Sequence, residues 1–164
     1  PEACNACHGS DANPAPPVDV ADNTATSARG VGAHQAHMTE GLLSDPVACS
    51  ECHLVPKALG DMGHIDTDLP AEVVFGSLAS TDGLTPKWDG ERCSNTYCHG
   101  AATPKWTAVG TGEAACGTCH GTPPPLPHPQ WPQCSFCHSK VADNNLNIID
   151  KTLHINGVVN FDLQ

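Results

Sequence analysis

The sequence of 164 residues has few of the large apolar side chains from which a folded domain builds its core. Leu, Ile, Val and Phe make up only about 18% of the chain, and aromatic residues only 4%. The formal net charge is −11. Such a composition is typical of chains that remain disordered because they bury too little apolar surface. Folding would therefore require a bound group that replaces the missing core.

Basic residues and long apolar runs are also scarce. The chain has 7 Lys and Arg against 18 Asp and Glu, which gives no positive surface for nucleic acid or for an anionic membrane. The longest apolar stretch, residues 71–79, is interrupted by Gly76 and Ser77 and is far shorter than a membrane span. No signal peptide is visible before Cys4. We therefore expect no nucleic-acid partner and no transmembrane segment.

Cysteine and histidine, in contrast, are abundant, with 10 residues of each. The cysteines form five close pairs, and each pair is followed directly by a histidine. The motifs are CNACH (Cys4, Cys7, His8), CSECH (Cys49, Cys52, His53), CSNTYCH (Cys93, Cys98, His99), CGTCH (Cys116, Cys119, His120) and CSFCH (Cys134, Cys137, His138). C-x-x-C-H is the attachment sequence of c-type haem, in which both thiols add to the vinyl groups and the histidine binds the iron. The pattern predicts five haem c groups.

Two other uses of cysteine fit this spacing less well. Zinc ligands are spaced to close a tetrahedron, which gives no reason for a histidine directly after every second cysteine. Cysteine pairs this close together form strained, redox-active disulfides and not structural ones. The pair Cys93–Cys98 is the exception, because four residues separate its members. Cys93 is either a free or zinc-bound thiol or, as we interpret it, a haem attachment site with an inserted loop.

Five histidines lie outside the motifs and match the number of predicted haems: His34, His37, His64, His128 and His154. If each supplies a second axial ligand, every iron is bound by two imidazoles and has a low reduction potential. Met38 and Met62 are then interpreted as packing residues. Saturated irons have no open position for a substrate, which favours electron transfer over enzymatic catalysis.

The chain contains a degenerate internal repeat, which spans about residues 4–76 and 116–162 of a single pentahaem domain formed by residues 1–164. Each half has a CHG motif and a Pro-containing segment, then a CS-x-CH motif, a His-Ile pair and a Val-Val segment. The repeat makes His64 and His154 equivalent, and His128 equivalent to either His34 or His37. The remaining histidine of that pair would serve the central haem or a haem of a neighbouring subunit.

Regular secondary structure is expected to be sparse. Residues 32–43 predict a short helix with His34 and His37 on one face. Residues 70–76 and 156–163 predict short strands that pair with each other. Residues 123–132 are expected to be a stiff, polyproline-like chain, and residues 21–30 a loop. The fold class is thus a mostly irregular multihaem cytochrome c fold with few short helices and one or two short strand pairs, in which the haems form the core.

The stretch from about residue 88 to 158 resembles a repeat in multihaem outer-membrane and extracellular cytochromes of metal-reducing bacteria. The shared order is a C-x4-C-H motif, then CGTCHG with Pro-Pro, His-Pro, a further C-x-x-C-H and His-Ile-Asn-Gly-Val-Val. Upstream, Gly-Ala-His-Gln-Ala-His and CSECH resemble the same group. The resemblance implies a cell-surface or extracellular protein, or alternatively a periplasmic one. It also implies redox partner proteins or extracellular acceptors, and a homo-oligomer in the form of a head-to-tail filament with haems stacked between subunits.

The sequence therefore favours an extracellular electron relay through five bis-histidine haems. Three alternatives remain open. These are a multihaem reductase with one open iron, a soluble periplasmic electron shuttle, and a colourless scaffold built on zinc or disulfides. The residues Trp88, Trp106 and Trp131 either cover haem faces or belong to a small ordinary core.

Overall fold

The structure of the protein is a computed structural model that describes residues 4–39 and 41–162. These residues include two short helices, α1 (His34–Met38) and α2 (Ser135–His138), and one antiparallel strand pair, β1 (Lys87–Trp88) with β2 (Cys93–Ser94). The described residues also form four short 3₁₀ helices, at Cys49–Glu51, Thr81–Gly83, Tyr97–His99 and Lys151–Leu153. The rest of the described chain is irregular, which confirms the predicted fold class.

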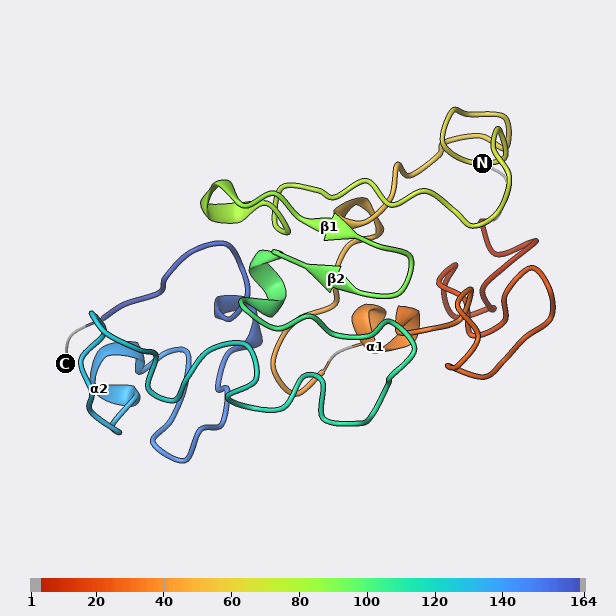
Figure 1. Ribbon diagram of the computed structural model, residues 1–164. Coiled ribbons are helices and arrows are strands. Elements are labelled where there is room, and N and C mark those ends of the chain that lie inside the picture. Colours follow the sequence, from red (N-terminus) through yellow and green to blue (C-terminus); the bar gives the residue numbers. More distant parts are fainter. Residues whose placement is uncertain (1–3, 40, 163–164) are drawn as a thin grey trace.

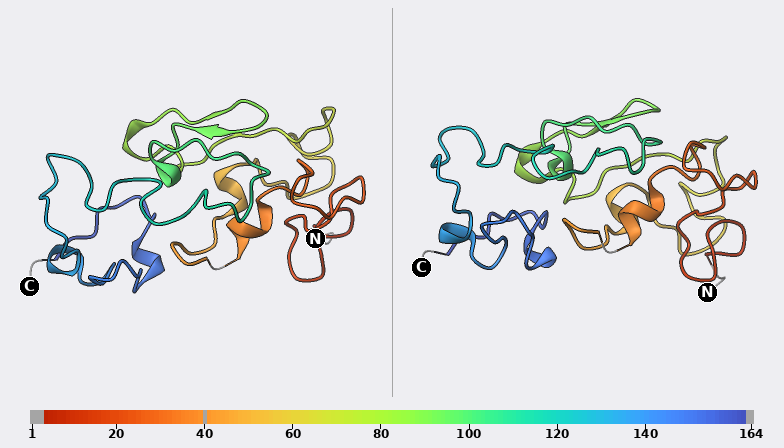
Figure 2. Two further views of the ribbon diagram at one scale, coloured as in Figure 1. Left: turned by 60° about the horizontal axis from the view of Figure 1, so that its bottom comes forward. Right: turned by 90° about the horizontal axis from the view of Figure 1, so that it is seen from below.

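The molecule is elongated, and the segment after α1 returns to the N-terminal end before the chain crosses to the opposite end (Figures 1 and 2). The N-terminal region lies at one end, α1 and the strand pair lie in the middle, and α2 lies at the opposite end. Within the residues that the structure describes, no helix has the length and apolar character needed to cross a membrane.

Helical turns form where the cysteine motifs require them. Cys49–Glu51, Tyr97–His99 and α2 each fall inside a motif. The amide of His53 donates to the carbonyl of Cys49 at 2.9 Å, and that of His138 donates to Cys134 at 3.0 Å. In a turn of this kind, residues three and four apart lie on one side. Both sulfurs and the imidazole of a motif can therefore face the same planar group.

The predicted strand pair between residues 70–76 and 156–163 is wrong. Residues 71–76 form no strand and bond to the second cysteine motif, because the amide of Val74 donates to Cys52 and that of Gly76 to Glu51. The second segment bonds in the same way to the last motif, through the Asp162 amide and the carbonyl of Cys137. Each segment supports a cysteine motif of its own half, so its hydrogen-bonding groups are no longer available to the other half.

The predicted helix at residues 32–43 is much shorter than expected. Helix α1 ends at Met38, where Thr39 becomes extended and its side-chain hydroxyl donates to the carbonyl of Gln35 at 2.7 Å. Residues 123–132 contain no helix or strand, but the chain turns where the His128 amide donates to the carbonyl of Pro125. A continuous polyproline helix is thus not formed. Residues 21–30 form a loop, as predicted.

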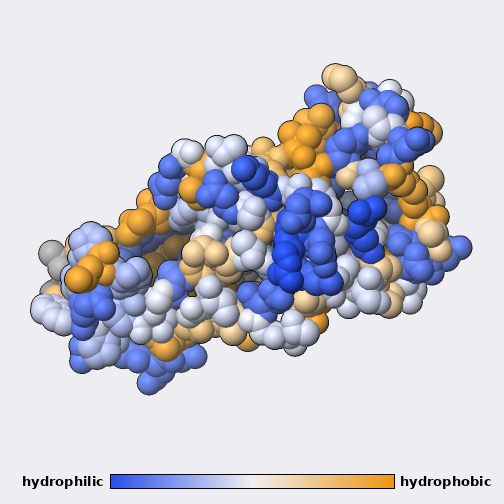
Figure 3. Space-filling view, in the orientation of Figure 1, coloured by the Kyte–Doolittle hydropathy of each residue, from blue (hydrophilic) through white to orange (hydrophobic). Residues whose placement is uncertain are grey.

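The protein part has almost no hydrophobic core. Among the described residues, the buried apolar ones are Ala15, Val31 and Ala79, and no large side chain is fully buried. Large apolar side chains are instead exposed, with Leu42 at 87% and Met62 at 81%. Figure 3 shows apolar atoms scattered across the surface, including the end that carries residues 54–75. This arrangement is consistent with the composition, because the polypeptide alone cannot supply a core.

A chain in which alanine replaces all ten motif cysteines is therefore expected to be unfolded. Far-ultraviolet circular dichroism should show a disordered chain without a cooperative thermal transition, whereas the haem-loaded protein should unfold cooperatively. A cooperative transition in the haem-free chain would contradict the composition argument.

Candidate functional site

The histidine rings of the described chain come together in four pairs. Each pair joins one motif histidine to one histidine outside the motifs. The ring centres are 6.2 Å apart for His34 and His53, 6.0 Å for His37 and His99, 6.4 Å for His120 and His154, and 6.2 Å for His128 and His138. The structure thus brings together eight of the ten histidines that the sequence singles out as metal ligands.

This spacing is the one that a shared metal ion requires. An imidazole nitrogen binds a metal at roughly 2 Å, and the ring centre lies roughly 1 Å behind it, so two rings across one ion have centres roughly 6 Å apart. Rings in direct contact would be closer. The four pairs therefore fit an iron between the two rings, with a cysteine pair beside each.

Hydrogen bonds at the opposite ring nitrogen strengthen this interpretation. Nine of the ten histidines have Nδ1 within 3.0 Å of a backbone carbonyl oxygen. A carbonyl only accepts, so Nδ1 carries the proton and Nε2 keeps a free lone pair. This is the arrangement found behind metal-binding histidines, where the bond fixes the tautomer and the ring direction.

His99 is the exception among the ten. Its Nδ1 is buried and has no hydrogen-bond partner within the described part of the chain. Burial lowers the pKa of this imidazole to about 4, the neighbouring His37 adds to the effect, and Glu113 opposes it. Burial also lowers the pKa of His34. Both rings are thus neutral at pH 7, the state in which imidazole binds a metal.

His8 and His64 are the two histidines for which the described structure shows no paired imidazole. They nevertheless have the same hydrogen bonds as the others. Nδ1 of His8 lies 2.9 Å from the carbonyl oxygen of Pro14, and Nδ1 of His64 lies 3.0 Å from that of Leu59. Both Nε2 atoms are consequently left for a ligand.

None of the ten cysteines forms a disulfide. Cys4, Cys7 and Cys116 are exposed, whereas Cys49, Cys52, Cys93, Cys98, Cys119, Cys134 and Cys137 are half-buried. The described residues also contain no group of three or more His, Cys, Asp or Glu side chains that would hold a metal ion by themselves. The structure thus offers neither a disulfide framework nor a tetrahedral zinc site in this part of the chain.

The three central motifs are packed closely together. Burial raises the pKa of Cys52 and of Cys98 to about 11, and the Cys52 thiol is near enough to add to the rise at Cys98. Cys93 also acts on Cys52, and Cys119 on Cys98. Groups bound at the second, third and fourth motifs would therefore be immediate neighbours.

The two halves of the chain hold their CS-x-CH histidines in the same way. Nδ1 of His53 lies 2.8 Å from the carbonyl oxygen of Glu72, and Nδ1 of His138 lies 2.6 Å from that of Asn160. Two residues after each of these carbonyls, an amide bonds to the same motif: Val74 donates to the carbonyl of Cys52, and Asp162 donates to that of Cys137. The hydrogen-bonding partners thus recur at equivalent places.

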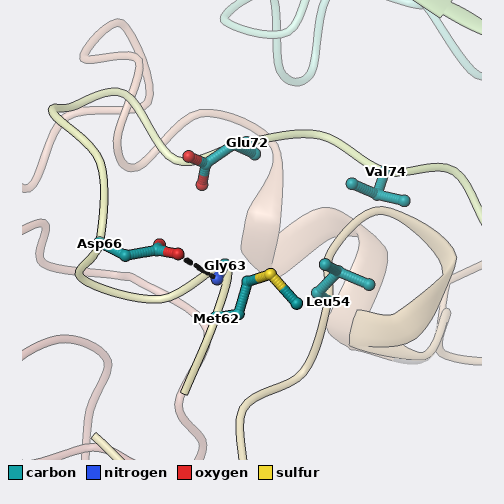
Figure 4. Close-up of a pocket in the computed structure, with 6 residues that line it drawn as sticks. All are labelled: Leu54, Met62, Gly63, Asp66, Glu72 and Val74. Carbon is teal, nitrogen blue, oxygen red and sulfur yellow. Dashed lines mark hydrogen bonds between the residues drawn. The ribbon is translucent and has the colours of Figure 1, made fainter. Parts of the chain in front are cut away.

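A shallow pocket is lined by residues that lie near His53 and His64 in the sequence (Figure 4). Leu54, Met62 and Val74 supply apolar side chains, and Asp66 and Glu72 supply polar ones. The carboxylate of Asp66 accepts from the amide of Gly63 at 3.0 Å and holds the turn that contains His64. A second pocket in the other half includes His138, Leu153 and Phe161. Open apolar walls of this kind suit the edge of a flat, apolar ligand.

Two features of the site have no signal in the sequence. The carbonyl behind His154 belongs to Leu43, which lies 111 residues away in the chain. Trp106 packs against both His34 and His37, although its sequence context only suggested a haem cover or a small core. Every residue has a backbone carbonyl, and a single tryptophan forms no periodic pattern. The sequence alone therefore predicts neither role.

Comparison with protein-family models gives a match to part of the chain. Residues 92–120 match the family model described as Geobacter CxxxxCH...CXXCH motif. The matched region contains the third and fourth cysteine motifs, including the C-x4-C-H variant with Cys93 and Cys98. It indicates a multihaem c-type cytochrome-like protein that binds haem c. No curated protein and no solved structure matches the chain.

Gly100 follows the third motif directly and packs against Cys119 of the fourth motif, which allows a testable prediction. Its φ is +56°, and a Cβ at this position would overlap the carbonyl oxygen of Cys119. G100A should therefore destabilise the haem-loaded protein and reduce haem attachment at Cys116 and Cys119. Thermal unfolding and the mass of the intact protein measure the two effects.

Gly110 provides a matched control, because its φ is +79° but no atom lies near a Cβ built there. G110A should show only the backbone cost of the left-handed conformation, about 1–2 kcal/mol, with full haem attachment. Equal behaviour of the two variants would show that the contact with Cys119 does not matter.

Proposed function

We propose that this protein is an electron-transfer protein with five covalently bound haem c groups, each held between two histidines. The observation that carries the proposal is the set of four ring pairs at 6.0–6.4 Å, each of which joins a motif histidine to one outside the motifs.

The fifth pair follows from the internal repeat. His120 of the first motif in the second half faces His154. The equivalent residues of the first half are His8 and His64, which we pair on this basis. The same comparison favours His34 over His37 as the counterpart of His128, because His138 faces His128 and its counterpart His53 faces His34. His37 is then the partner of His99 in the central site.

Haem bound at these motifs would supply an iron that alternates between the ferric and ferrous states. The polypeptide would hold the imidazoles for the iron, and in every histidine except His99 the carbonyl behind Nδ1 prevents the ring from turning away. With two imidazoles for every iron, no coordination position is left for a substrate. We therefore propose a relay and not an enzyme.

The order of the sites supports a relay along the molecule. The first site adjoins the second, because the Gln35 side chain on α1 donates to the carbonyl of Ala15 at 2.8 Å. The cysteines of the second and third motifs are neighbours, and Gly100 packs on Cys119 of the fourth. Asn160 links the last two sites, since its side chain donates to Leu153 and its carbonyl faces His138. The sites thus follow one another in sequence order.

The ends of this series indicate where partners would bind. The first and last motifs lie in the regions at opposite ends of the elongated molecule (Figure 1). Electrons would enter at one end and leave at the other. We propose that the protein works outside the cytoplasm, where its partners are redox proteins, an extracellular acceptor or further copies of this chain arranged head to tail as a filament. The net charge of −11 favours partners with a basic contact surface.

Ligand binding and spin state test the proposal. In the unmodified haem-loaded protein, all iron should be low-spin in the ferric state, and carbon monoxide should leave the ferrous spectrum unchanged. H64A should convert one haem to a high-spin, carbon monoxide-binding form, because His8 loses its partner. A high-spin fraction before mutation would instead support a reductase with an open iron.

The pairing of His8 with His64 is tested by removing one haem at a time. In H64A combined with C4A and C7A, the high-spin signal should disappear together with one haem mass. In H64A combined with C116A and C119A, the signal should persist. A signal that disappears only in the second combination would assign His64 to the haem of His120.

A further inference from the structure

Helix α1 supplies ligands to two different sites. His34 and His37 lie one turn apart and face His53 and His99, respectively. The helix has only five residues, no side-chain cap at its N-terminus and no buried residue. Helix formation alone is therefore too weak to hold two imidazoles in place.

Trp106 contacts both of these imidazoles. The indole ring and the imidazole of His34 meet edge to face, with ring centres 4.8 Å apart and planes at 89°. For His37 the rings are stacked, with centres 5.7 Å apart and planes at 22°. The segment that carries Trp106 passes beside α1 in Figure 1.

The indole itself is held on two sides. Its N–H donates to the carbonyl of Arg29 at 2.7 Å, across 77 residues of sequence. A second neighbour is Gly32, where a Cβ would overlap the indole ring, and Trp88 meets the indole edge to face with ring centres 6.3 Å apart. A glycine at this position thus allows the ring to reach the start of α1.

We propose that Trp106 is a positioning residue that fixes the ring planes of two axial ligands, His34 and His37, in two adjacent haem sites. Each imidazole has one hydrogen bond behind it, from Nδ1 to the carbonyl of Val31 or Ala33. A single bond at Nδ1 leaves the ring free to rotate about the direction of that bond. Contact with the flat indole removes this freedom for both rings.

The ring planes differ between the two sites. The planes of His34 and His53 are 25° apart, whereas those of His37 and His99 are 81° apart. In low-spin ferric haem, the angle between axial imidazole planes determines the electron paramagnetic resonance signal. The state of Trp106 is therefore visible in two separate signals.

The proposal rests on the proposed bis-histidine ligation, and its test uses the haem-loaded protein. The signals of the two sites are first identified with H34M and H37M, each of which alters one site. W106L should then shift both identified signals and leave the other three in place. W106F retains a flat ring but not the N–H donor, so its shifts should be smaller.

Trp131 supplies the control, because its ring contacts Phe136 and no histidine in the described structure. W131L should leave the signals of both α1 sites unchanged. The proposal is overturned if W106L leaves the two signals in place, if it shifts all five, or if W106F shifts them as much as W106L. The proposed function fails separately, through a high-spin iron or a missing haem in the unmodified protein.

Discussion

The hydrogen bond between a histidine Nδ1 and a backbone carbonyl is the interaction on which this structure depends. Two imidazoles that share an iron must remain roughly 6 Å apart and face each other. A hydrophobic core normally maintains such distances, but here the buried apolar residues of the described chain are Ala15, Val31 and Ala79. Bonds from nine of the ten imidazoles to the main chain take over this task. The path of the backbone thereby becomes the main determinant of the site.

This constraint explains why so little regular secondary structure forms. Most carbonyls inside a helix or sheet are already paired, whereas one in a turn or an irregular segment is available to an imidazole. The irregular segment at residues 71–76 is used in this way, since Glu72 accepts from His53 while Val74 and Gly76 bond to the same motif. Gly and Pro, with 15 residues each, allow the tight turns that such a path needs.

The sequence predicts which histidines come together better than it predicts the path of the chain between them. The motif spacing predicts the haem attachment sites, and the count of spare histidines predicts one partner for each, which the four ring pairs match in kind. The Val-Val segments were expected to be strands, but neither forms a strand in the described residues. Their pairing was wrong because the backbone groups of each segment bond to a cysteine motif nearby. Contacts such as His154 with Leu43, and Trp106 with α1, depend on the folded chain and leave no local pattern.

The low apolar content also has a physical explanation in this account. Exposed side chains such as Leu54, Met62 and Val74 line open pockets, and covalently bound haem would give them an apolar surface to pack against. The most direct test is a crystal structure of the haem-loaded protein with iron positions located by anomalous scattering. The account predicts five irons in sequence order, each between the two histidines paired above. Fewer than five irons, or an iron bound by a single histidine, would contradict it.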